Sequence, residues 1–98
     1  MIRHIVFFNA KNKDDLEDIL AGLRILKGIP HATTLEIEPN IHSDMLSNAV
    51  EVVVYGEFPD LNALNAYKAH PLYQQSITRV RPLRELRIAA DIQSPFTK

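Results

Sequence analysis

Two segments of this chain are apolar on both faces of a predicted β-strand. Residues 2–9 and 49–58 are rich in β-branched and aromatic residues, the composition typical of strands. In the first segment, Val6 and Phe8 lie on one face of the strand, and Ile5 and Phe7 lie on the other. In the second segment, the valines of residues 50–54 lie on both faces in the same way. Apolar side chains on both faces of a strand indicate that both faces are covered by other parts of a protein.

Two further segments alternate in the way of half-exposed strands. Residues 33–38 place Leu35 and Ile37 on one face and polar residues on the other. Residues 83–92 place Leu86, Ile88, Ala90 and Ile92 opposite Glu85, Arg87 and Asp91. Residues 39–48 are polar and predict a loop, and we expect residues 94–98 to form a loose tail.

The first predicted helix begins at Lys13, with Asn12 as its N-cap. Its apolar positions follow the 3.6-residue period: Leu16, Ile19, Leu20, Leu23 and Leu26. Lys27 supplies a basic last turn, Gly28 is expected to form a left-handed cap, and Pro30 prevents the helix from continuing.

A second helix is predicted after the residue 49–58 strand. Asp60 is its expected N-cap, and Leu61, Leu64 and Tyr67 occupy successive turns. Pro71 disfavours helical geometry at the preceding residue, so this helix should end near position 70. Proline suits the first turn of a new helix, and we expect a short one over residues 72–80, closed by Pro82.

The predicted order is βαββαβ, with an extra helical segment before the last strand. This order suits an α+β fold in which helices lie on one face of an antiparallel sheet. The helices leave the other face uncovered, although two of the strands are apolar on that side as well. A second copy of the chain would cover it, so the pattern predicts a homodimer.

Composition narrows the function classes. The chain has 98 residues, 46% of them hydrophobic, which suits a single domain over residues 1–98. A net charge of −1 gives no electrostatic reason to expect nucleic acid or a membrane as a partner. The absence of cysteine excludes disulfides and thiolate chemistry. The apolar stretch at residues 5–8 is too short for a signal-peptide core, so the expected location is the cytoplasm.

Several stretches resemble the stress-responsive dimeric α/β-barrel (Dabb) family. The opening IRHIVFF at residues 2–8 is similar to the start of the family. YGEFPD at 55–60 resembles its central strand, and residues 84–91 its last strand with a terminal aspartate. The most specific stretch is YKAHP at residues 67–71, because Tyr-x-x-His-Pro is a hallmark of the family.

The resemblance implies a ferredoxin-like fold and a dimer whose two sheets face each other as an α/β barrel. Some members are linked to stress responses, and at least one plant relative is a polyketide cyclase. That cyclase uses a tyrosine at the position of Tyr67 and a histidine at the position of Tyr73. The residue that acts there as general base is therefore absent here, and the resemblance implies no cyclase activity on linear polyketides.

Four residues are candidates for chemistry: His4, Tyr67, His70 and Tyr73. His4 shares a strand face with Val6 and Phe8, so we interpret it as lining a pocket rather than as catalytic. Tyr67 suits core packing or a hydrogen bond to a ligand carbonyl. We expect His70 to brace the helix junction, and we rank a role as an acid or base second. Tyr73 could pack or bind a ligand, but a phenol is a poor base at neutral pH.

We predict a mainly apolar pocket between the sheet and the helices, with no general-base histidine at its centre. Its expected lining is His4, Val6, Phe8, Val52, Val54, Tyr67, His70 and Tyr73. No cofactor or metal is expected, because His31 and His42 have no ligand-like spacing and no phosphate-binding loop or dinucleotide motif is present. RNA binding is disfavoured because the 51–57 strand carries two acids and a single aromatic residue.

Two functions remain open at this point. The chain is expected to be a small stress-responsive barrel protein that binds a small apolar or aromatic molecule. The alternative is a cofactor-free enzyme on the same barrel, such as a cyclase, isomerase or monooxygenase. An enzyme should place at least two of His4, Tyr67, His70 and Tyr73 around one cavity.

Overall fold

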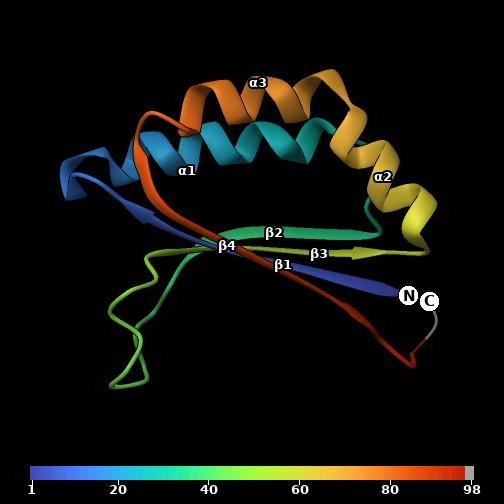
Figure 1. The fold of residues 1–98 in the computed structure, drawn as a ribbon, viewed down its shortest axis with the longest axis horizontal. Helices are drawn as coiled ribbons and strands as arrows, with labels where there is room; N and C mark the ends of the chain where they lie inside the picture. The colour runs from blue at the N-terminus through green and yellow to red at the C-terminus, as the bar shows by residue number, and fades with distance from the viewer. Residues whose placement is uncertain (97–98) are drawn as a thin grey trace.

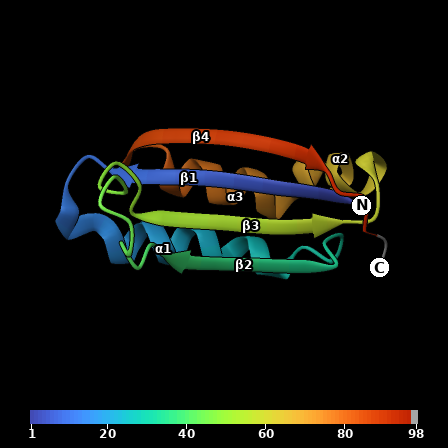
Figure 2. The same cartoon turned by 90° about the horizontal axis from the view of Figure 1, so that it is seen from below.

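The structure is a computed structural model, and it describes residues 1–96. Four strands form one antiparallel sheet in the order β2-β3-β1-β4 (Figure 2). Their bounds are β1 Ile2–Ala10, β2 Thr34–Pro39, β3 Val52–Phe58 and β4 Arg84–Gln93. The two doubly apolar segments of the sequence are thus the two central strands, as their composition predicts.

The helices lie on one face of this sheet (Figure 1). A 3₁₀ turn, η1 (Lys13–Asp15), leads into α1 (Leu16–Arg24), which runs into a second 3₁₀ turn, η2 (Ile25–Gly28). After β3 come α2 (Leu61–Ala69) and α3 (Pro71–Val80). The α+β class and the ferredoxin-like order are therefore confirmed. Within residues 1–96, no helix is long and apolar enough to cross a membrane.

Side-chain caps start the helices where the sequence predicts them. The Oδ1 atom of Asn12 accepts a hydrogen bond from the Asp14 amide at 3.0 Å, and Asp60 does the same for Ala63 at 2.8 Å. At the break between α2 and α3, His70 has extended backbone angles and Pro71 occupies the first helical turn. The break at His70 and Pro71 separates α2 from α3, and the two helices run in different directions (Figure 1).

Two local predictions are wrong. The strand predicted to start at position 49 begins at Val52, because a turn precedes it in which the Val50 amide donates to the carbonyl of Ser47. Gly28 is not a left-handed cap, since no glycine in residues 1–96 has a positive φ. Its role is close packing: a Cβ atom at Gly28 would lie 2.8 Å from Cδ1 of Leu72 in α3.

The register of β1 separates two sets of side chains. Val6 pairs with Val54 of β3 and Ala89 of β4, and these residues face the helices. Phe7, one residue along, pairs with Val53 and Ile88 and faces away from the helices. The hydrophobic core forms on the helix side, with Val6 and Val54 at 2% and 1% exposure. The opposite face is apolar but uncovered within this chain, and Phe7 is 37% exposed.

The end of the chain is only partly as expected. Ser94 is buried, and its amide donates to the carbonyl of Met1 at 2.9 Å, so the predicted loose tail does not begin there. Phe96 is exposed, with the guanidinium of Arg3 5.8 Å from its ring centroid. Positions 97–98 of the predicted tail lie outside the described residues.

Gly22 of α1 allows α1 and α3 to pack closely. A Cβ atom at this position would lie 2.7 Å from Cγ2 of Val80, which is buried and has a stiff β-branched side chain. The approach also lets the hydroxyl of Ser76 donate to the carbonyl of Gly22 at 2.8 Å. The contact between these helices forms one wall of the site described below.

We predict that Gly22→Ala lowers the free energy of unfolding by about 1–2 kcal/mol. The added methyl group overpacks against Val80, which outweighs the roughly 1 kcal/mol that alanine normally contributes in a helix. Urea unfolding of the wild type and the variant measures the difference. In a Val80→Ala background the same change should be neutral or stabilising; an equal loss in both backgrounds would contradict the packing explanation.

Candidate functional site

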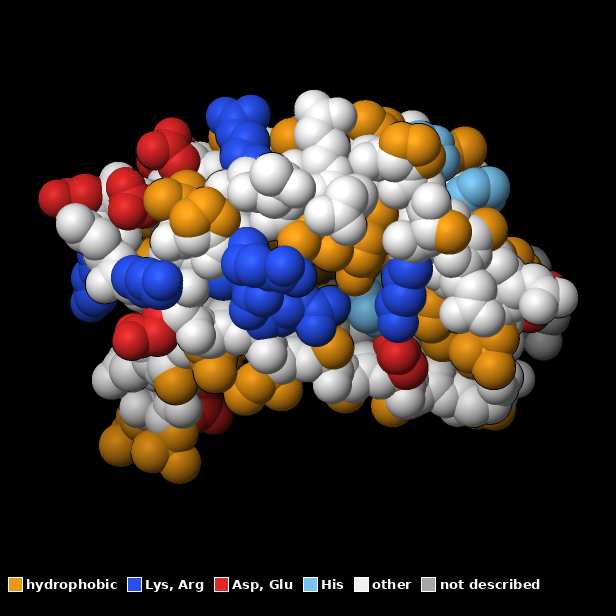
Figure 3. All heavy atoms as spheres, turned by 45° about the horizontal axis from the view of Figure 1, so that its top comes forward, with side chains coloured by type: hydrophobic (Ala, Val, Ile, Leu, Met, Phe, Trp, Pro, Cys, Tyr) orange, Lys and Arg blue, Asp and Glu red, His pale blue; other side chains and the backbone are white. Residues whose placement is uncertain are grey.

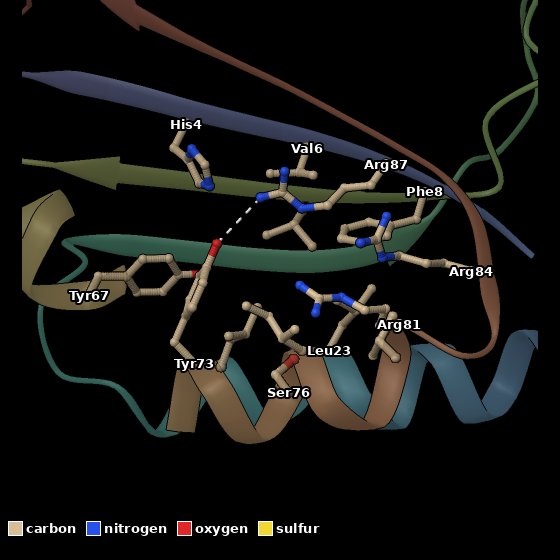
Figure 4. A pocket seen from close by; sticks show the side chains of 14 residues that line it. His4, Val6, Phe8, Leu23, Tyr67, Tyr73, Ser76, Arg81, Arg84 and Arg87 are labelled. Carbon is tan, nitrogen blue, oxygen red and sulfur yellow. Dashed lines mark hydrogen bonds between the residues drawn. The ribbon is translucent and has the colours of Figure 1, made fainter. Parts of the chain in front are cut away.

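A cavity of roughly 160 Å³ lies between the sheet and α3 (Figure 4). Side chains of β1, β3, β4 and all three helices line it. They are His4, Val6, Phe8, Leu23, Leu26, Val54, Tyr67, Tyr73, Ser76, Ile77, Val80, Arg81, Arg84 and Arg87. A dry cavity of about this size holds one benzene ring.

The apolar wall of the cavity follows from the register of the sheet. Val6 and Phe8 of β1 and Val54 of β3 all point toward the helices, where Leu23 of α1 and Val80 of α3 meet them. Each of these five side chains is at most 5% exposed. A ligand seated here would touch hydrocarbon on several sides, which favours an apolar or aromatic body.

His4 is buried at one end of the cavity, with 1% exposure. Its Nδ1 atom lies 2.5 Å from a carboxylate oxygen of Asp91, which pairs with it across β1 and β4. A carboxylate can only accept, so Nδ1 carries the proton and donates it. In the neutral ring Nε2 is then the atom with a free lone pair, available to accept a proton or a hydrogen bond.

The pKa of His4 is lowered below 6.5, chiefly because burial penalises the imidazolium. The hydrogen bond and the negative charge of Asp91 act in the opposite direction, and Lys68 and Arg87 add smaller lowering effects. The geometric contact with Asp91 would qualify as a salt bridge only if His4 were charged. Since burial prevails, the pair at neutral pH is a neutral imidazole bonded to a carboxylate.

Two phenols border the same end of the cavity. Tyr67 of α2 is 1% exposed, and its ring makes edge contacts with those of His4 and Tyr73 at centroid distances of 6.1 and 5.3 Å. Burial raises the pKa of Tyr67 well above its usual value of 10.0, so this phenol stays protonated and is a hydrogen-bond donor. Tyr73 of α3 accepts a hydrogen bond from Arg87 at 3.3 Å (Figure 4).

Three arginines that the sequence pattern does not predict also line the cavity: Arg81, Arg84 and Arg87. Figure 3 shows blue basic side chains gathered beside a hollow in which a pale blue histidine and orange apolar atoms are visible. Arg81 caps the end of α3, and the other two belong to β4. The spacing of Arg84 and Arg87 along β4 does not predict that both line one cavity, because residues three positions apart normally lie on opposite faces of a strand.

The predicted pocket residues divide into two groups. His4, Val6, Phe8, Val54, Tyr67 and Tyr73 line the cavity together, and three of the four candidates for chemistry are among them. Val52 and His70 do not line it. Val52 is wholly buried in the hydrophobic core. The Nδ1 atom of His70 accepts the Leu72 amide at 3.1 Å, which is the bracing role at the helix junction.

Most of the residues that line the pocket are apolar, as the sequence predicts, but one side of it is polar. His4 lies at one end of the cavity, and the absence of a general-base histidine from its centre stays a prediction. The arginines make one side of it basic, and His4 provides a neutral imidazole held by a carboxylate, which a core position on a strand did not suggest. No group of three or more metal-ligating side chains occurs in residues 1–96.

The arrangement combines three chemical capacities. Nε2 of His4 can accept a proton, the Tyr67 hydroxyl can donate to a carbonyl oxygen, and the arginines can hold an anionic group. The first two lie together at one end of the cavity, and the arginines lie along β4 and the end of α3 (Figure 4).

Solved structures of the same fold come from several organisms. A dimeric ferredoxin-like protein of unknown function from Jannaschia sp. CCS1 shares 21% identity with a TM-score of 0.84, over 95% of this chain and 98% of that one. A Dabb family protein with a ferredoxin-like fold from Mesorhizobium loti shares 24% identity with a TM-score of 0.78, over 95% of each chain. At these identities the likeness shows the fold.

An enzyme has the same fold. The hydroxynitrile lyase of Passiflora edulis shares 17% identity with a TM-score of 0.74, over 97% of this chain and 95% of that one. A search of curated proteins found no match to the sequence.

The family comparison covers nearly the whole chain. Residues 2–94 match the model of the Stress responsive A/B Barrel Domain, abbreviated Dabb. The match includes all four strands and all three α-helices, together with the Tyr67–Pro71 stretch that carries the resemblance in the sequence. The chain belongs to the stress-responsive α/β-barrel (Dabb) family.

Proposed function

We propose that this protein binds a small apolar or aromatic molecule in the cavity between its sheet and α3. The observation that carries the proposal is the combination of an apolar wall with the Tyr67 hydroxyl. Tyr67 is 1% exposed as a residue and lines the cavity, and its hydroxyl is not among the buried side-chain atoms that lack a partner in residues 1–96, of which Arg3 Nε is the example. A phenol whose hydroxyl borders a cavity can donate to a molecule bound there, so a ligand oxygen is a suitable acceptor.

The protein that binds this ligand is proposed to be a homodimer. Phe7 and Ile88 lie side by side on the uncovered face of the sheet, and Val53 pairs with Phe7 on its other side. Phe7 is 37% exposed and Ile88 is 53% exposed. A second copy that places its sheet against this face would cover them. Dimeric structures of the same fold, such as the one from Jannaschia, support this arrangement. A cytoplasmic location remains a prediction from the sequence, and a role in stress responses follows only from the family description.

A second candidate function is a cofactor-free enzyme, and one observation favours it. The Nδ1–H of His4 is bonded to Asp91, which orients the ring and leaves Nε2 as a base beside the Tyr67 phenol. Such a pair could remove a proton from carbon next to a carbonyl while the phenol stabilises the developing oxyanion. The lyase from Passiflora is an example of an enzyme on this fold.

The binding proposal is tested with p-cresol, a neutral probe of one ring. We expect saturable changes in the methyl NMR signals of Val6, Val54 and Val80, with a dissociation constant on the order of 1 mM. Ile77→Trp should abolish these changes, because Ile77 lines the cavity and the indole would fill it.

Gln74→Trp is the matched control, since Gln74 is exposed on the same helix and outside the cavity. It should leave binding of p-cresol unchanged. Equal binding to both tryptophan variants, or signal changes confined to residues outside the cavity, would contradict the proposal.

The dimer is tested by sedimentation velocity at micromolar concentration, where we expect a dimer and an interface of roughly 1,200 Å² or more. Phe7→Asp or Val53→Asp should give monomeric, unfolded or aggregated protein, because either change would bury an unpaired carboxylate in the interface. Leu61→Asp, at an exposed position on α2, should remain dimeric. A wild type that sediments as a stable folded monomer would refute the dimer.

The acid–base candidate predicts a pH dependence of stability. Because the pKa of His4 is lowered in the folded state, the unfolded chain binds more protons below about pH 6.5. The free energy of unfolding should therefore fall as the pH decreases from about 6.5, by about 1.4 kcal/mol for each unit of pKa lowering. Urea unfolding of wild type and His4→Gln between about pH 5 and 7 measures this contribution as their difference in slope.

Asp91→Asn should lower the pKa of His4 further, because it removes the carboxylate whose hydrogen bond and charge raise that pKa. Lys68 and Arg87, the other charged groups that act on His4, stay in place in this variant. NMR titration of the His4 ring protons, assigned with His4→Gln, measures the change. A pKa that rises in Asp91→Asn would exclude Asp91 as the group that holds the ring.

A further inference from the structure

The basic side of the cavity depends on an irregularity in β4. Along β1, Phe8 pairs with Arg87 and Ala10 pairs with Arg84, with a register shift between Asn9 and Ala10. The shift leaves one extra residue in β4. Because Phe8 and Ala10 both face the helices, the shift places both arginines on that side, although they are three positions apart. Bulges of this kind commonly re-aim a side chain next to a functional site.

A third arginine joins them from the end of α3. Arg81 caps this helix, and its amide donates to the carbonyl of Ile77 at 2.8 Å. The Leu83 amide then donates to the carbonyl of Val80 at 2.9 Å, and this turn leads directly into β4 at Arg84. The turn therefore brings Arg81 beside the two arginines of the strand, and all three line the same cavity (Figure 4).

Among residues 1–96, no acidic side chain is found in an ion pair with these three arginines. The contacts of His4 with Asp91 and of Arg24 with Glu38 both lie outside the cluster. Partial burial lowers the pKa of Arg84, and the positive charges of Arg87 and Arg81 lower it further. The chain as a whole has 11 basic and 12 acidic residues, so an excess of arginine does not explain the cluster.

The cluster borders an apolar space of the size of one ring. The cavity of roughly 160 Å³ continues from the arginines to the wall formed by Val6 and Val54. Guanidinium groups form paired hydrogen bonds with carboxylates in a fixed geometry. A molecule with a ring on the apolar wall would place an attached carboxylate at Arg84 and Arg81, while Arg87 remains bonded to Tyr73.

We infer that the ligand of this cavity is an aromatic or short acyl carboxylate, with its carboxylate bound by Arg81 and Arg84 and its apolar body against Val6 and Val54. This inference rests on the proposed binding function and specifies its substrate class. It distinguishes this protein from a binder of neutral apolar molecules, which would make no use of the positive charges of Arg81 and Arg84.

The test compares benzoate with benzamide, which has nearly the same shape and no charge. Methyl and amide NMR titrations of the wild type should show benzoate binding about tenfold more tightly or better. Raising the ionic strength from roughly 0.05 to 0.5 M should weaken the binding of benzoate and leave the binding of benzamide unchanged, because salt screens the attraction between charges. Phenyl phosphate is the third probe; tighter binding of it than of benzoate would overturn the assignment to a carboxylate.

Arg84→Gln should reduce the preference for benzoate over benzamide to about twofold or less. Arg81→Gln should also reduce the preference for benzoate. This second variant provides the test if Arg84→Gln does not fold. Arg79→Gln is the matched control, because Arg79 is exposed on α3 and does not line the cavity. It should keep the full preference. An unchanged preference in both cavity variants would overturn the inference.

The two proposals fail in different ways. If p-cresol, benzamide and benzoate all leave the signals of the cavity unchanged, the proposed binding function is wrong. If p-cresol and benzamide bind but benzoate binds no more tightly, the cavity binds neutral molecules and only the carboxylate inference is wrong.

Discussion

The pairing of β1 with β3 on one side and β4 on the other is the constraint on which the rest of the structure depends. Since side chains alternate along a strand, this register sends Val6 to the helices and Phe7 to the opposite face. A slip by one residue would exchange the two sets and bring Arg3 into the core in place of His4. The core, the cavity and the uncovered apolar face are all consequences of this single register.

The same register explains why the cavity is polar on one side. The helix-facing side of β4 carries Arg87 and Asp91, whereas its apolar residues, Ile88 among them, lie on the uncovered face. β4 is an edge strand, and both Arg87 and Asp91 are exposed to solvent, so these charges carry little desolvation cost. Here Asp91 is bonded to His4, and Arg87 is bonded to Tyr73. Both charged residues of β4 are therefore hydrogen-bonded to side chains that line the cavity, and they set its polar character.

His4 shows how burial and pairing together set a chemical state. Burial alone would favour the neutral imidazole in either tautomer, with the proton on Nδ1 or Nε2. The carboxylate of Asp91 fixes the proton on Nδ1, and the neighbouring aromatic rings of Phe58 and Tyr67 restrict the ring by edge contacts. The neutral ring therefore has its free nitrogen in a defined orientation, which both a ligand-binding and an acid–base role require.

The sequence by itself determined the strands, the helices and most of their ends, because these depend on periodicity and on local caps such as Asn12 and Asp60. It also identified His4, Tyr67 and Tyr73, which the structure brings around one cavity. It did not reveal the three arginines, because the register shift opposite Ala10 that turns Arg84 inward arises only when β4 pairs with β1. Likewise Gly28 looked like a helix cap, and only the packing of α3 showed that it makes room for Leu72. Helix caps and periodicity depend on residues that are close together in the sequence and can therefore be predicted from it. The lining of a cavity depends on contacts between residues far apart in the chain, which only the tertiary structure brings together.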